Sequence, residues 1–205
     1  MNRDPDDLVV VDPPVAATRA AHVFASSDPF VRPFADAVAF RQVIYPVAWT
    51  APREVLSELF ESARASGQTC AYVRYTEGFE EAREQRPHAW QIPLLSSAYL
   101  AAVTEPLEHQ VVSAKGDWGL WMTHLDLALL GASRWVGQGF SETLKLDWRR
   151  QVVALIRDLA DDQARLGATY DWTPALLHHL FGPEQAEQLA SEAGVNLQRF
   201  ATSGT

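Results

Sequence analysis

The chain has 205 residues, 47% of them hydrophobic, so it can bury a substantial core within one domain. It carries 17 basic and 26 acidic residues, and the formal net charge of −9 would repel a phosphate backbone or an anionic membrane surface. This composition argues against nucleic acid as a partner, and no apolar run approaches the roughly 18 to 20 residues that span a bilayer.

The single cysteine and the N-terminus both bear on the cellular compartment. Cys70 excludes a disulfide within the chain, and the acidic segment Met1–Asp7 lacks the basic start of a secretory leader. Among the basic residues only Lys115 and Lys145 are lysines, which together with the many alanines is typical of GC-rich bacterial genes. We expect a bacterial, cytoplasmic protein.

The first part of the chain divides into an arm and the start of a domain. Residues 1–37 contain five prolines and six aspartates without a sustained helical or strand period, so we expect an N-terminal arm that lies on the domain or stays mobile. Residues 38–205 are expected to form a single domain. The β-branched and aromatic run Phe40–Trp49 predicts a strand, the apolar stripe of Arg53–Ala65 predicts a helix, and Thr69–Tyr75 predicts a second strand.

A β-hairpin is the clearest supersecondary feature. Its arms are Leu107–Ser113 and Trp118–His124, which are joined by a four-residue turn. A register that pairs His109 with Met122 gives the hairpin one apolar and one mostly polar face. The apolar face carries Leu107, Val111, Leu120 and Met122, and the other face carries Glu108, Gln110, Trp121 and Thr123.

Helices dominate the prediction after the hairpin. Leu127–Leu130 is expected to extend the sheet as a third strand, and a helix follows Ser133. A long amphipathic helix over Asp147–Leu166 is expected to cover the apolar face of the hairpin, and two shorter helices run from Thr173 to Gly182 and from Pro183 to Gly194. Strands early and helices late predict an α+β fold: a mainly antiparallel sheet with a central β-hairpin, packed against helices that dominate the C-terminal third.

The hairpin and its exit, Trp118–Asp126 through Leu129–Ser133, resemble a segment of small uncharacterised bacterial α+β proteins. The resemblance covers about sixteen residues and includes no catalytic motif. It implies a bacterial cytoplasmic α+β domain, and no activity comes with it.

Two histidines and an aspartate of the hairpin form a candidate metal site. The predicted register places His109 and His124 on one face, with Asp126 two residues further along. Two imidazoles and one carboxylate can bind a transition metal and leave positions open for water or substrate, as a metal-dependent hydrolase or oxygenase requires. The alternative is that each histidine is a core residue bonded to the backbone, because the same face carries the apolar side chains of the hairpin.

Tryptophan supplies the candidates for a binding surface. The chain has seven, and Trp121 lies on the less apolar face of the hairpin, while Trp90 and Trp172 lie in or near turns. Exposed tryptophan is enriched at binding hot spots, and an acidic surface around it would attract a basic partner. These three residues are the predicted binding residues, with burial in the core as the alternative.

Three hypotheses of function follow. The acidic charge and the absence of a catalytic motif favour a non-catalytic module that sequesters a basic protein, in the manner of an inhibitor or immunity protein. The second is a metal-dependent enzyme using the two histidines. The third is a DNA-binding regulator acting through the C-terminal helices, because Leu189–Asn196 resembles the turn of a helix-turn-helix unit, although Arg199 is the one basic side chain beyond it. No motif names a cofactor or a reaction, so whether the chain is an enzyme stays open.

Overall fold

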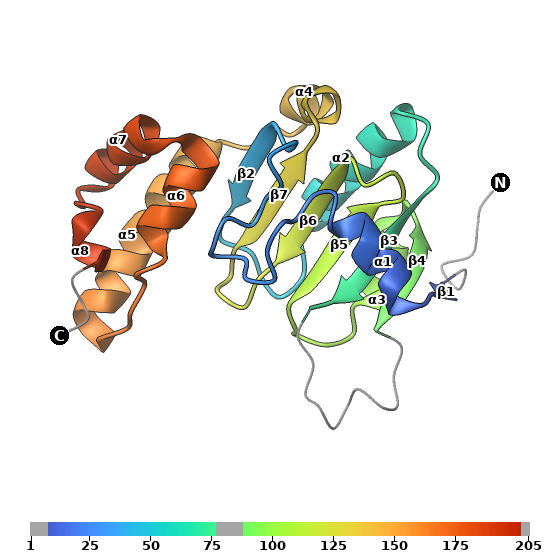
Figure 1. Ribbon diagram of the computed structural model, residues 1–205, viewed down its shortest axis with the longest axis horizontal. Coiled ribbons are helices and arrows are strands. Elements are labelled where there is room, and N and C mark those ends of the chain that lie inside the picture. Colours follow the sequence, from blue (N-terminus) through green and yellow to red (C-terminus); the bar gives the residue numbers. More distant parts are fainter. Residues whose placement is uncertain (1–7, 77–87, 202–205) are drawn as a thin grey trace.

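The computed structural model describes residues 8–76 and 88–201, which form one seven-stranded sheet and eight helices (Figure 1). The strands are β1 (Val9–Val10), β2 (Phe40–Ile44), β3 (Cys70–Tyr75), β4 (Ala89–Pro93), β5 (His109–Ser113), β6 (Trp118–Met122) and β7 (Ala128–Ala132). The helices are α1 (Pro13–Ala20), α2 (Arg53–Ala65), α3 (Ser96–Ala102), α4 (Arg134–Thr143), α5 (Trp148–Leu166), α6 (Thr173–Phe181), α7 (Pro183–Ala193) and α8 (Gln198–Ala201). The order in the sheet is β1-β4-β3-β5-β6-β7-β2, and every pairing is antiparallel. The predicted α+β fold is confirmed.

The central hairpin has the predicted register. His109 pairs with Met122 and Val111 pairs with Leu120 across β5 and β6, and β7 continues the sheet as the third strand. Because side chains alternate between the two faces of a strand, Val111, Leu120 and Met122 lie together in one core. All three strands are buried along their whole length, since other elements cover both faces of the sheet.

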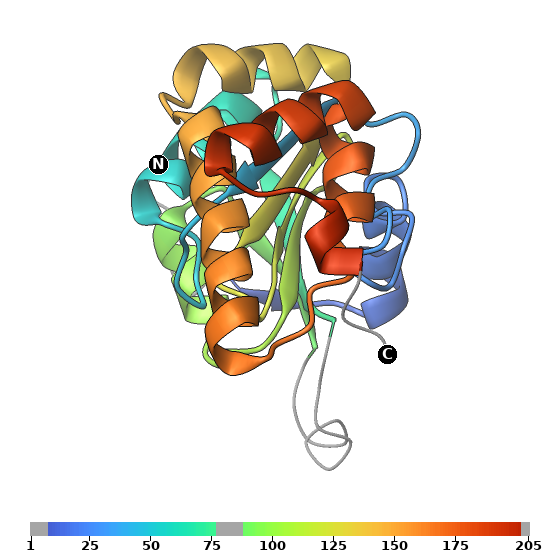
Figure 2. The same cartoon turned by 90° about the vertical axis from the view of Figure 1, so that its left-hand side faces the viewer.

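The covering elements divide the interior into two cores. The first core joins Val112, Trp121 and Leu129 to helices α5–α8 and to residues 20–38. The second core joins the opposite face of the same strands to α2, α3 and α4. Figure 2 shows the C-terminal helices gathered in front of the sheet, where α5 packs on β2.

The prediction that the long helix covers the apolar face of the hairpin is wrong. Helix α5 packs in the first core with Trp121, whereas the shorter helices α2–α4 cover Val111 and Leu120. An apolar stripe shows that a helix packs against something, but it carries no information on which face of a sheet receives it. Since both faces of this sheet are covered, the stripe of α5 fits either one.

The described part of the N-terminal region lies on the sheet. Strand β1 pairs with β4 at one edge, and α1 packs on β3, β4 and β5; the sequence pattern predicts neither element. Beyond α1, the rings of Phe24 and Phe34 lie against Gly119 and Gly131, which pair with each other across β6 and β7. A Cβ atom on Gly131 would lie 2.4 Å from the Phe34 ring, so these glycines provide the space for the rings.

Local signals set several helix ends where the sequence predicts them. Helix α2 covers Arg53–Ala65, as expected from its apolar stripe. Helix α5 begins after Asp147, whose side chain accepts a hydrogen bond from the backbone N–H of Arg150, and it ends at Gly167 with φ at 68°. Among the described residues, no helix has the length and apolar character needed to cross a membrane.

Candidate functional site

His109 is a buried residue whose ring nitrogens are both bonded within the fold. Its Nδ1 donates to the carbonyl of Leu107 at 2.8 Å, so Nε2 is the acceptor for the Tyr99 hydroxyl, also at 2.8 Å. The Tyr99 oxygen in turn accepts the backbone N–H of Ala51 at 3.1 Å. Burial lowers the pKa of His109 to about 4, which keeps the imidazole neutral. These contacts tie β5 to α3 and to the segment before α2, so the geometry favours the structural alternative for this histidine.

His124 lies apart from His109, because the chain leaves β6 after Met122 and enters a turn. Its Nδ1 donates to Glu108 Oε1 at 2.6 Å, and the same oxygen accepts the backbone N–H of His124 at 3.2 Å. The Glu108 side chain is 3% exposed, whereas that of His124 is 55% exposed. Asp126 is exposed in the same turn, with φ at 53°. Nowhere in residues 8–76 and 88–201 do three His, Cys, Asp or Glu side chains gather in a group that could hold a metal ion.

An aromatic wall stands beside His124. The ring of Phe30 lies edge-on to the His124 imidazole at a centroid distance of 5.5 Å and stacks on Trp172 at 4.3 Å. Tyr170 lies edge-on to Trp172 at 6.0 Å. Phe30 comes from the N-terminal region and Trp172 from the start of α6, so segments far apart in the sequence build this wall.

Acidic side chains converge on Tyr45 at the same end of the first core. The Tyr45 hydroxyl donates to Asp158 Oδ2 at 2.7 Å. Burial, this hydrogen bond and the negative charges of Asp158, Asp126 and Asp162 all raise the pKa of the Tyr45 phenol. The pKa of Tyr170 is also raised, by burial and then by Asp162, so this carboxylate acts on both tyrosines.

Together these residues form one surface made by the segment after β2, the β6–β7 turn, α5 and the segment before α6. We name it the acidic–aromatic surface and define it as Tyr45, His124, Asp126, Asp158, Asp162, Tyr170 and Trp172. On α5, Asp162 forms an exposed ion pair with Arg165 at 3.2 Å, which is the pattern of a solvated, salt-bridged helix face. Asp158 departs from it, because its partner Tyr45 lies 113 residues away along the chain.

No protein-family model matches the sequence, and no curated protein or solved structure matches it either. The resemblance of the segment Trp118–Ser133 to small bacterial α+β proteins therefore stays a prediction. Any argument about function has to start from the side chains themselves.

The three predicted binding tryptophans occupy different environments. Trp121 is fully buried and lies edge-on to Phe24 at 5.1 Å. Trp90 is half-buried on β4, edge-on to Tyr75 at 5.7 Å. Only Trp172 belongs to the acidic–aromatic surface. Trp135, in the first turn of α4, is 80% exposed. Its exposure could not be predicted from the sequence, because the apolar pattern of this helix does not show how its first turn is oriented.

Three neighbouring strands, β3, β5 and β6, carry buried polar side-chain atoms on the face of the sheet that packs in the first core. Arg74 pairs with Gln110 across β3 and β5, and Gln110 pairs with Trp121 across β5 and β6. Among the described residues, Arg74 Nε, Gln110 Oε1 and Trp121 Nε1 are buried without a hydrogen-bond partner. Burial also lowers the pKa of Arg74. The hairpin face that the sequence predicts to be mostly polar is thus covered, and two of its polar atoms, Gln110 Oε1 and Trp121 Nε1, have no partner in the described part of the chain.

Within the described residues, the chain after Gly194 forms α8, Gln198–Ala201, and Phe200 is buried in the first core. The predicted helix-turn-helix unit extends past residue 201, and that part of it lies outside the described residues, so it stays a prediction.

Proposed function

We propose that this protein is a non-catalytic module that binds a basic protein, and that the acidic–aromatic surface is where it binds. The single observation that carries the proposal is the hydrogen bond of the Tyr45 hydroxyl to Asp158 at 2.7 Å, on a phenol that the charges of Asp126 and Asp162 also act on. An inhibitor or an immunity protein that sequesters its target would act in this way.

The chemistry of this surface suits arginine and lysine side chains. Carboxylates accept charge-assisted hydrogen bonds from guanidinium and ammonium groups, and aromatic rings attract the same cations through their faces. Tyrosine and tryptophan add rigid apolar contact area, which is why both are enriched at binding hot spots. The net charge of −9 would also steer a basic partner toward the protein.

The surface is partly preorganised. The hydrogen bond from Tyr45 orients the Asp158 carboxylate, and the stack between Phe30 and Trp172 holds the indole in place. A side chain that is already fixed loses less conformational entropy when a partner binds. The preorganisation therefore supports a binding role more than scattered surface charge would.

The test compares two double variants with the same change of charge. Asp158→Asn with Asp162→Asn removes two carboxylates of the acidic–aromatic surface and keeps an acceptor for the Tyr45 hydroxyl. Glu184→Gln with Glu187→Gln removes two exposed carboxylates of α7, away from this surface. The probe is an arginine-rich peptide of about ten residues, and calorimetry measures its Kd at salt concentrations from about 50 to about 300 mM.

We expect the α5 variant to weaken binding about tenfold and the α7 variant to weaken it less than about twofold. Binding of the wild type should also weaken as salt rises. Any basic protein that co-purifies from the source cell should be retained by the α7 variant and lost with the α5 variant. Equal effects of the two variants would show that only total charge matters and would contradict the proposal.

A further inference from the structure

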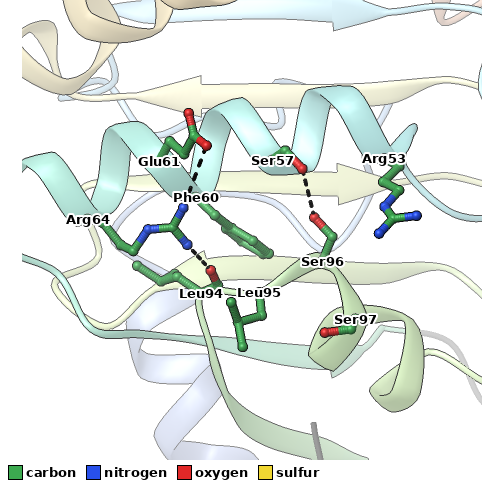
Figure 3. A pocket seen from close by; sticks show the side chains of 9 residues that line it. All are labelled: Arg53, Ser57, Phe60, Glu61, Arg64, Leu94, Leu95, Ser96 and Ser97. Atoms are coloured by element: carbon green, nitrogen blue, oxygen red, sulfur yellow. Dashed lines mark hydrogen bonds and ion pairs between the residues drawn. The ribbon is translucent and has the colours of Figure 1, made fainter. Parts of the chain in front are cut away.

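A pocket of about 220 Å³ lies between α2 and α3, beside the second core. Its apolar lining comes from Phe60, Leu94 and Leu95 (Figure 3). Pockets for drug-sized molecules are typically about 300–1,000 Å³, so this one suits a smaller molecule. It belongs to different elements from the acidic–aromatic surface.

Two serine hydroxyls face each other across this pocket. Ser57 Oγ on α2 and Ser96 Oγ on α3 are 3.2 Å apart, so one donates to the other (Figure 3). A hydroxyl carries one hydrogen and two acceptor positions, so the accepting serine still has its own hydrogen to donate. Both side chains are half-buried, and the exposed hydroxyl of Ser97 lies at the rim.

Two arginines flank the serines. Arg64 donates to the carbonyl of Leu94 and forms an ion pair with Glu61 at 3.9 Å, which holds its guanidinium over one end of the pocket. Arg53 also lines the pocket, and Figure 3 shows it on the opposite side of the two serines from Arg64. Within residues 8–76 and 88–201, no hydrogen bond or ion pair of the Arg53 guanidinium is present. Its charge is therefore available to a ligand.

We propose that this pocket binds a small phosphate monoester with an apolar body. Arg53 and the accepting serine of the Ser57–Ser96 pair supply the donors that a phosphate accepts from, and the apolar body rests on Phe60 and Leu95. The protein as a whole repels anions, so binding depends on these short-range contacts and on the apolar part of the ligand. Two arginines on one small pocket stand out in a chain with an excess of acidic residues.

The experiment is a titration of the full chain, followed by two-dimensional ¹H–¹⁵N NMR at constant ionic strength. Phenyl phosphate is the probe, inorganic phosphate tests the anion alone, and benzyl alcohol tests the apolar part alone. Phenyl phosphate should cause saturable shifts in the amides of α2 and of residues 94–97, with a Kd in the millimolar range or below, about 10 mM at most. Both fragments should bind more weakly.

Arg53→Gln should raise the Kd for phenyl phosphate about fivefold or more, because it removes a guanidinium that no described residue pairs with. Arg134→Gln is the matched control, since Arg134 is exposed on α4 and does not line this pocket. Ser57→Ala is a second variant, and it should weaken binding about two- to threefold. A Kd above about 10 mM for phenyl phosphate, equal Kd values for the two arginine variants, or benzyl alcohol binding as tightly as phenyl phosphate would overturn the proposal.

Discussion

Within β5 and β6, the two faces of the central hairpin differ in whether their buried polar atoms are hydrogen-bonded. On the second-core face, Trp118 Nε1 donates to Gln68 Oε1 at 3.2 Å, and both ring nitrogens of His109 are bonded. On the first-core face, neither Trp121 Nε1 nor Gln110 Oε1 has a hydrogen-bond partner within residues 8–76 and 88–201. A buried polar group without a hydrogen bond lowers the free energy of unfolding by about 1–3 kcal/mol. Packing alone would therefore favour apolar side chains at these two positions of the first-core face. The acidic–aromatic surface lies at the end of this same core, which is where we place the function.

Lowering the pH should cause the largest change in stability, through protonation of His109 on the second-core face. Burial lowers its pKa to about 4 from an ordinary value of 6.5, so its contribution to stability is fully present above pH 6.5 and is lost as the pH falls toward 4. This group alone should lower the free energy of unfolding by about 3 kcal/mol between pH 7 and pH 4. Urea unfolding across this pH range measures the loss.

The control for this prediction separates His109 from the other titrating groups. His109→Gln should flatten the pH dependence by that amount, whereas His22→Gln, at an exposed position, should leave it unchanged. If the wild type and the His109 variant lose stability in parallel, the imidazole is not held neutral by burial.

A smaller effect should follow from adding a methyl group at Gly131. Its Cβ would lie 2.4 Å from the Phe34 ring, so Gly131→Ala should destabilise the protein by about 1–3 kcal/mol. In α4, a Cβ at Gly139 meets only Ser62 Oγ at 3.4 Å, so Gly139→Ala should stabilise the helix by about 0.5–1 kcal/mol. Thermal unfolding of both variants gives the sign of each change, and a Gly131→Ala variant as stable as the wild type would refute the docking of Phe34 on this glycine.

The smallest effect distinguishes the two tryptophans of β6 directly. Trp118→Phe and Trp121→Phe remove the same atoms from fully buried sites, but only the first also breaks a hydrogen bond. Trp118→Phe should therefore be more destabilising by about 1 kcal/mol. Denaturant unfolding of the two variants measures this difference. A greater loss for Trp121→Phe would mean that its N–H is paired in solution.

The parts of the fold that depend on neighbouring residues could be predicted from the sequence. The stripe of Arg53–Ala65 specifies a helix, and the alternation in His109–Met122 specifies a hairpin and its register, because both patterns reflect burial of one side of a single element. Helix α1 and strand β1 were missed, since a proline-rich segment with little periodicity is ordered only by the sheet beneath it.

The candidate site was less accessible to sequence reasoning. His124 and Trp172 stood out by residue type, but nothing local connects either of them to Phe30, which touches both. The sequence gives no sign that Asp158 has a partner, because Tyr45, to which it is hydrogen-bonded, lies on a distant segment of the chain. Such contacts have no periodic signature and become visible only when the elements pack.

The sequence by itself determined the fold class, the hairpin with its register, most helix ends and the acidic charge, since these depend on spacing, propensity and composition within short windows of the chain. Only the tertiary structure decided that α5 packs in the first core and that His109 is buried while His124 is exposed. It also decided that the charges of three aspartates act on the Tyr45 phenol. The physical reason is that the local pattern of an amphipathic element shows which of its side chains must be buried. Which other element buries them depends on the packing of the whole chain.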